Sequence, residues 1–139
     1  MHISPHLCFD GTCREAFQVY QAILGGTIQT MLAYGESPMA ASTDPRWHGR
    51  IVHATLVLDG VELTGVDMIP ASYRQPQGFF ITITVDGVAR AQEVFRTLSE
   101  GGVIQVPFES TFWSPGFGVL VDRFNIPWEI NANGGQAVA

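Results

Sequence analysis

Two stretches of this 139-residue chain repeat each other, and together they decide the fold. "FDGTCREAFQVYQAILGGTI" runs from Phe9 to Ile28, and "VDGVARAQEVFRTLSEGGVI" runs from Val85 to Ile104. Their Asp-Gly and Gly-Gly pairs recur 76 residues apart. Each stretch starts at the end of an expected strand and continues with apolar residues at three- and four-residue spacing, which is typical of a helix with one buried face. The chain therefore contains the same structural unit twice.

The two expected helices carry recognisable boundary residues. Thr12 followed by Glu15 predicts a capping box, and Asp86 predicts a cap for the second helix. Gly25 and Gly101 predict left-handed stops at the two ends. The core-facing stripes are expected at Cys13, Ala16, Phe17, Tyr20, Ile23 and Leu24, and at Ala91, Val94, Phe95 and Leu98.

Strands are expected after each helix. Residues 27–34 and 103–111 follow the Gly-Gly pairs and are rich in β-forming residues. Asp59-Gly60 predicts a two-residue hairpin between residues 51–58 and 61–67. Its register pairs Leu58 with Val61, Val57 with Glu62, Thr55 with Thr64 and His53 with Val66. Residues 117–122 and 127–131 form the equivalent pair late in the chain.

Each half of the chain thus reads strand, helix and three strands. We predict an α+β fold of two βαβββ modules within a single domain, residues 1–139. Module one spans residues 1–67, a linker spans 68–77, module two spans 78–132 and a tail spans 133–139. A long polar loop is expected at residues 34–50.

The composition excludes several classes of partner. The chain is 46% hydrophobic with a net charge of −6, and its seven Lys and Arg residues are scattered, which disfavours nucleic acid. No apolar run reaches the roughly 20 residues that a membrane span needs. The first residues do not read as a signal peptide, and Cys8 and Cys13 fit a reducing compartment. We expect a cytoplasmic protein that binds neither nucleic acid nor membrane.

Four stretches carry a resemblance to a known family: "FDGTCREAFQVY", "YGESPMA", "GFFITITVD" and "EGGVIQVPFESTFWSPGFGVLVDRFNIPWEIN". They extend from about Pro5 to Asn131. On these residues the chain resembles the PhnB-like, or demethylubiquinone methyltransferase-like, branch of the vicinal-oxygen-chelate superfamily. That superfamily holds glyoxalase I, extradiol dioxygenases and the bleomycin and fosfomycin resistance proteins. The resemblance implies curved mixed sheets with a cup-shaped pocket. Asn125 stands where the family usually has Gly, and Asn tolerates the same left-handed turn.

The resemblance also implies a divalent metal held by two His and two Glu. It places the His ligands at Ser4 and Phe80, and the Glu ligands at Glu62 and Glu129. Ser is a weak neutral ligand and Phe is none, so we expect no metal or other cofactor. The alternative is a divalent metal ion bound by His6, Glu62 and Glu129, since His6 lies two residues after Ser4 on the same face of its strand.

Strand parity predicts which side chains face away from the helices. Candidate catalytic residues are Glu62, Glu129 and His53, as general acids or bases or as a proton shuttle. Trp47, in the polar loop, and Trp113, near the rim, are candidates for stacking on a planar ligand. The other candidate ligand-binding residues are His6, Thr55, Thr64, Phe80, Thr82 and Thr84.

Three functions follow as alternatives. The first is a metal-independent small-molecule binding protein that forms a homodimer, with the cup closed by a second chain. The second is a metal-dependent lyase, isomerase or dioxygenase related to glyoxalase. The third is a methyltransferase, which only the family label suggests and which the absence of a Gly-rich nucleotide-binding turn disfavours. The sequence leaves open whether the protein is an enzyme, and which ligand it takes.

Overall fold

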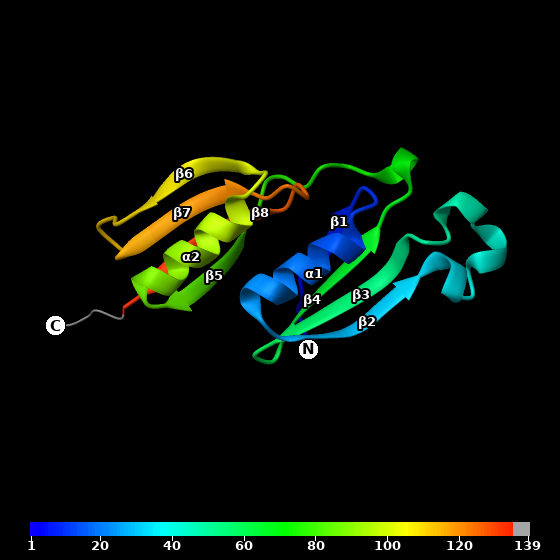
Figure 1. Cartoon of the computed structure of the whole chain (residues 1–139), viewed down its shortest axis with the longest axis horizontal. Helices are drawn as coiled ribbons and strands as arrows, with labels where there is room; N and C mark the ends of the chain where they lie inside the picture. Colours follow the sequence, from blue (N-terminus) through cyan, green and yellow to red (C-terminus); the bar gives the residue numbers. More distant parts are fainter. Residues whose placement is uncertain (135–139) are drawn as a thin grey trace. The chain divides into compact units, whose positions relative to one another are not determined.

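The computed structural model describes residues 1–134, which form two α-helices and eight strands. The chain divides into two compact units, Met1–Gln75 and Pro76–Ala139, and the division falls inside the expected linker. Each unit holds one helix and one four-stranded sheet (Figure 1). The element order confirms the predicted α+β fold of two βαβββ modules. Residues 135–139, most of the expected tail, lie outside the described residues.

In unit 1 the elements are β1 (His6–Phe9), α1 (Cys13–Leu24), β2 (Thr27–Ala33), β3 (Ile51–Leu58) and β4 (Val61–Asp67). The strand order is β1-β4-β3-β2, with β1 parallel to β4 and the other pairs antiparallel. Asp59 and Gly60 both have positive φ, as a tight hairpin turn of this type requires. Three of the four register pairs predicted for this hairpin are present, and the pairing of β3 with β4 ends at Ala54 and Gly65, before His53 and Val66.

In unit 2 the elements are β5 (Ile81–Asp86), α2 (Val88–Ser99), β6 (Val103–Glu109), β7 (Gly116–Val121) and β8 (Pro127–Asn133). The order β5-β8-β7-β6 repeats that of unit 1, again with a parallel pair formed by the first and last strands. The duplication seen in the sequence is therefore a duplication of topology.

Each helix covers one face of its own sheet (Figure 1). Phe17 of α1 lies so close to Gly65 of β4 that a Cβ there would stand 2.6 Å from the ring. Phe95 of α2 makes the same close approach to Gly118 of β7. Most of the predicted stripe residues are buried here: Cys13, Ala16, Phe17, Tyr20, Ala91, Val94, Phe95 and Leu98. Burial of these faces is the main stabilising term of each unit.

The start of α1 differs from the prediction. The Thr12 side chain makes no capping hydrogen bond. Instead Asp67, at the end of β4, accepts a hydrogen bond from the Cys13 backbone N–H at 2.9 Å and another from the Ile51 N–H at 2.8 Å. A carboxylate is favoured at this end of a helix because the backbone N–H groups and the helix dipole both attract negative charge.

The predicted cap of α2 is also wrong. Asp86 is the last residue of β5, and the N-cap position belongs to Gly87, which has no side chain to donate or accept. Gly25, in contrast, ends α1 as expected, with φ at +88° and its N–H bonded to the Gln21 carbonyl.

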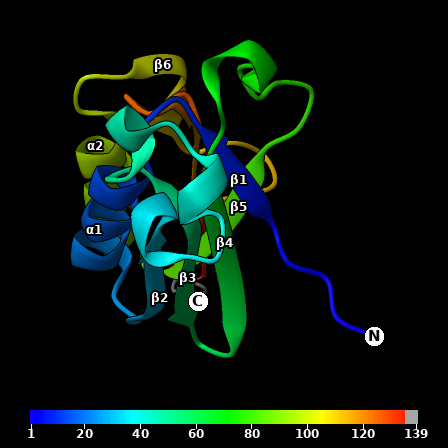
Figure 2. The ribbon, with the colours of Figure 1, turned by 90° about the vertical axis from the view of Figure 1, so that its right-hand side faces the viewer.

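The two units differ most in one connection. In unit 1, residues 34–50 join β2 to β3 and contain three 3₁₀ turns, Tyr34–Glu36, Ala40–Ser42 and Pro45–Trp47. In unit 2 the corresponding link is only residues 110–115. Figure 2 looks onto this end of unit 1, where the turns gather beyond the ends of β2 and β3. A further turn, Pro70–Ser72, follows β4. Among the described residues, no helix has both the length and the apolar character of a membrane span.

Candidate functional site

The face of the unit 1 sheet that α1 leaves uncovered carries a row of polar side chains. His6 of β1 lies opposite Thr64 of β4, and Thr64 lies opposite Thr55 of β3. The His6 Nδ1 atom is 2.6 Å from Thr64 Oγ1. Leu7 and Leu63, the neighbours of opposite parity, are buried toward the helix. Because side chains alternate along a strand, three of the predicted site residues, His6, Thr64 and Thr55, lie next to each other on this face.

The surroundings of His6 determine both its charge and which ring nitrogen carries the hydrogen. Desolvation and the nearby His53 lower the pKa of His6, so its imidazole is neutral at pH 7. Thr64 Oγ1 also lies 3.4 Å from the Pro5 carbonyl, which can only accept. With that bond made, Nδ1–H of His6 donates to Thr64, and Nε2 keeps a lone pair available to a ligand.

His53 and Glu62 lie on the same face as this row. His53 Nε2 is 3.3 Å from Thr55 Oγ1. Glu62 Oε1 is 3.7 Å from His2 Nε2, and the same His2 nitrogen is 2.7 Å from Ser4 Oγ. Sequence reasoning missed His2, because it precedes the first strand and no periodicity marks it.

In unit 2 the uncovered face carries a second polar row. Thr82 of β5 lies opposite Glu129 of β8 and donates its hydroxyl hydrogen to Glu129 Oε1 at 2.9 Å. Thr84 lies opposite Asn131 in the next row. Asn131, which sequence reasoning missed, accepts a hydrogen bond from Ser114 Oγ at 2.7 Å. Its position two residues after Glu129 on the same strand was the signal that marks it.

The two units carry their carboxylates at different positions of the repeat. The 76-residue repeat relates His6 to Thr82, and these two residues pair with Thr64 and Glu129 respectively. Thr64 is thus the structural counterpart of Glu129. Glu62 lies two residues earlier on its strand and has its own surroundings.

The residues present do not fit the metal site that the resemblance implies. Among residues 1–134, no three His, Cys, Asp or Glu side chains come together in a way that could hold a metal ion. Phe80 is exposed and has no donor atom, and Ser4 is bonded to His2. One oxygen of Glu129 already accepts from Thr82. A site of two His and two Glu therefore lacks both of its nitrogen donors.

The two candidate tryptophans have different surroundings. Trp113 is 58% exposed and lies edge-on to Phe112 and Phe117, in the short link of unit 2. Trp47 is half-buried in the long loop of unit 1, edge-on to Tyr34 with ring centroids 5.9 Å apart. Trp47 lines an open cavity that the loop forms with residues 68–72.

Both cysteines are free thiols, and neither is activated. Burial, and then the Asp67 charge, raises the pKa of Cys13 far above its ordinary value. Burial also raises the pKa of Cys8. A thiol is a nucleophile only as the thiolate, so neither cysteine serves as one at neutral pH.

The duplicated βαβββ topology is shared with solved structures that include a glyoxalase-related enzyme, so the fold is the same. A glyoxalase-related enzyme from Fulvimarina pelagi shares the fold at 13% identity, with a TM-score of 0.62 and coverage of 100% of this chain and 93% of that one. The PhnB protein from Bacillus cereus shares it at 24% identity and a TM-score of 0.82, over 96% of this chain and 100% of that one.

Sequence similarity shows the family of this chain. Residues 1–131 match the model of the family described as 3-demethylubiquinone-9 3-methyltransferase, and the chain belongs to that family, the PhnB-like branch. Protein PA1353 from Pseudomonas aeruginosa is 40% identical, with a TM-score of 0.88 over 96% of this chain and 98% of that one. Protein YjdN from Escherichia coli is 31% identical over 94% of this chain and 95% of its own length.

Proposed function

We propose that this protein binds a small organic molecule on the helix-free face of each sheet, without a metal ion. The observation that supports this most is that each module presents a hydrogen-bonded polar pair there, His6 with Thr64 and Thr82 with Glu129. Curved sheet faces that combine apolar surface with a few fixed polar groups are common sites for small ligands.

The chemistry of these groups favours a ligand that donates hydrogen bonds. The neutral His6 offers the lone pair of Nε2, and Glu129 keeps one carboxylate oxygen outside its bond to Thr82. A metal-dependent lyase or dioxygenase is not favoured, because Phe80 and Ser4 stand at the positions of the nitrogen donors. Methyl transfer, which the family description names, has no nucleotide-binding turn to support it in this sequence.

A thermal-shift screen of polar metabolites tests the proposal, using protein first dialysed against EDTA. We expect a ligand that raises the melting temperature equally with and without EDTA, since binding to the folded state alone stabilises it. Glu129→Gln should lower the affinity for that ligand about tenfold, which is the usual cost of losing one charge-assisted hydrogen bond. Glu109→Gln, an exposed carboxylate in the same unit, is the matched control. Ligands that bind only after metal is added, or equal losses in both variants, would reject the proposal.

We also propose that the protein is a homodimer. The support comes from β6, an edge strand of its sheet, whose Val103, Ile104 and Val106 are between 44% and 62% exposed. Exposed apolar side chains on an unpaired edge strand favour association with another chain, and a two-fold dimer is the simplest closed arrangement. Light scattering should give twice the mass of the chain at micromolar concentration. Val106→Lys should shift it toward the monomer, whereas Val61→Lys, at an exposed hairpin end, should not.

A further inference from the structure

The long loop of unit 1 forms a cavity that is separate from the sheet faces. Residues from the ranges 34–50 and 68–72 line this open cavity of about 810 Å³, a volume typical of small-ligand sites. Its walls combine the aromatic rings of Tyr34 and Trp47 with the apolar side chains of Met39, Met68 and Ile69. None of the sheet-face residues discussed above lines it. The shorter link of unit 2, residues 110–115, has no such turns.

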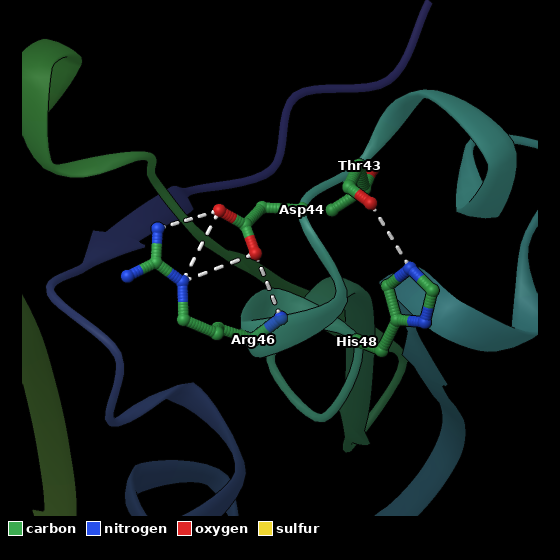
Figure 3. Close-up of polar contacts among 4 residues, drawn as sticks. All are labelled: Thr43, Asp44, Arg46 and His48. Atoms are coloured by element: carbon green, nitrogen blue, oxygen red, sulfur yellow. Dashed lines mark hydrogen bonds and ion pairs between the residues drawn. The ribbon is translucent and has the colours of Figure 1, made fainter.

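The loop has defined internal contacts, some of which Figure 3 shows. Asp44 caps the turn Pro45–Trp47 by accepting from the Arg46 backbone N–H at 2.9 Å. His48 Nε2 lies 3.1 Å from both the Ala40 and the Thr43 carbonyl oxygens. Carbonyls only accept, so Nε2 carries the hydrogen and ties the two ends of this segment together. The wall of the cavity is therefore held in place by its own hydrogen bonds.

Two arginines line the cavity, and only one of them is neutralised. The Arg46 guanidinium lies 2.7 Å from Asp44 Oδ2, and its hydrogen bonds lower the pKa of Asp44 to about 2. This pair keeps both of its charges at any physiological pH. Within residues 1–134 the Arg50 guanidinium makes no ion pair and no hydrogen bond.

Arg50 is nevertheless fixed in position. Its Cζ lies 4.8 Å from the centroid of the Trp47 ring, which is a cation–π contact. Its backbone is also tied, because its carbonyl accepts from the Tyr34 N–H at 2.8 Å. A planar fork of donors with no carboxylate partner matches the geometry of a carboxylate or phosphate.

The first Asp-Gly turn of the repeat provides space for Arg50. A Cβ on Gly11 would overlap the Arg50 guanidinium. Gly87, at the same place in module two, has the same φ of +89° but nothing within 4 Å of such a Cβ. The backbone conformation explains glycine at both positions, and the contact with Arg50 is an additional requirement at Gly11 alone.

We propose that this cavity binds a small organic anion. A carboxylate or phosphate pairs with the N–H groups of Arg50, while the body of the ligand lies against Trp47, Met39 and Ile69. The site does not depend on the function proposed for the sheet faces, because the two share no residue. It belongs to unit 1 only, because only that unit has the long loop and Arg50.

The test uses benzoate and phenyl phosphate as anionic probes, with benzamide as the neutral analogue of benzoate. Calorimetry should show that at least one anion binds ten or more times tighter than benzamide, and the Trp47 indole N–H signal should shift in ¹H–¹⁵N NMR spectra. Arg50→Gln should lower the affinity for the anion at least tenfold. Arg14→Gln removes the same charge from a residue outside this cavity and should change affinity less than twofold. The two anions show which group the site prefers.

A second pair of variants guards against a loss of folding. Gly11→Ala and Gly87→Ala introduce the same backbone strain, but only Gly11→Ala displaces Arg50. Circular dichroism confirms that each variant is folded, and only Gly11→Ala should weaken anion binding. The proposal is overturned if neither anion binds saturably, if benzamide binds as tightly as benzoate, or if Arg50→Gln and Arg14→Gln have equal effects. An unshifted Trp47 signal on binding would overturn it as well.

Discussion

Asp67→Asn is expected to destabilise unit 1 by about 2–4 kcal/mol. Asp67 is 1% exposed, and its two oxygens accept from the Cys13 and Ile51 backbone N–H groups. Asn keeps the size but only one acceptor, so one charge-assisted bond of about 1.5–3 kcal/mol is lost and one buried N–H is left unpaired at about 1–3 kcal/mol. Relaxation of the neighbouring backbone recovers part of this sum, which gives the range stated.

Urea denaturation followed by circular dichroism measures the free energy of unfolding, and hydrogen exchange at the Cys13 and Ile51 amides localises the effect. Asp10→Asn removes the same charge from an exposed residue and should change stability by less than about 0.5 kcal/mol. If Asp67→Asn costs less than about 1 kcal/mol, or if exchange at the two amides is unchanged, the capping role assigned to Asp67 is wrong.

Three further predictions concern single side chains. The pKa of His6 is lowered in the folded state, so its contribution to stability is full above pH 6.5 and falls as the pH drops through 6.5 toward the folded-state pKa. In thermal melts from pH 5 to 8, His6→Asn should flatten this fall of stability with pH. Cys13 should resist a thiol reagent at pH 8 until the protein unfolds, while Cys8, which is only half-buried, reacts slowly; rapid modification of Cys13 in the native state would contradict its burial. Gly65→Ala places a Cβ 2.6 Å from the Phe17 ring and should cost about 1–3 kcal/mol in thermal melts, so an unchanged melting temperature would refute the close packing of α1.

Strand parity predicted which face of each sheet carries the candidate site residues. It placed His6, Thr82 and Glu129 on the helix-free faces, because side chains alternate along a strand and Leu7 and Trp128 mark the buried side. It did not identify their partners. The bonds of His6 to Thr64 and of Thr82 to Glu129 depend on parallel pairing between strands far apart in the chain, and no turn fixes that register.

The sequence by itself determined the two modules, the buried faces of the helices and the Asp59-Gly60 hairpin register. These features depend on periodicity and turn chemistry, and both can be read from residues that are close together in the sequence. The capping of α1 by Asp67 and the position of Arg50 against Gly11 were decided only by the tertiary structure. Each of these contacts joins residues about 40 or more positions apart. The packing of α1, β4 and the long loop therefore decides which residues meet. A local pattern such as Thr12 with Glu15 points to the wrong cap for α1.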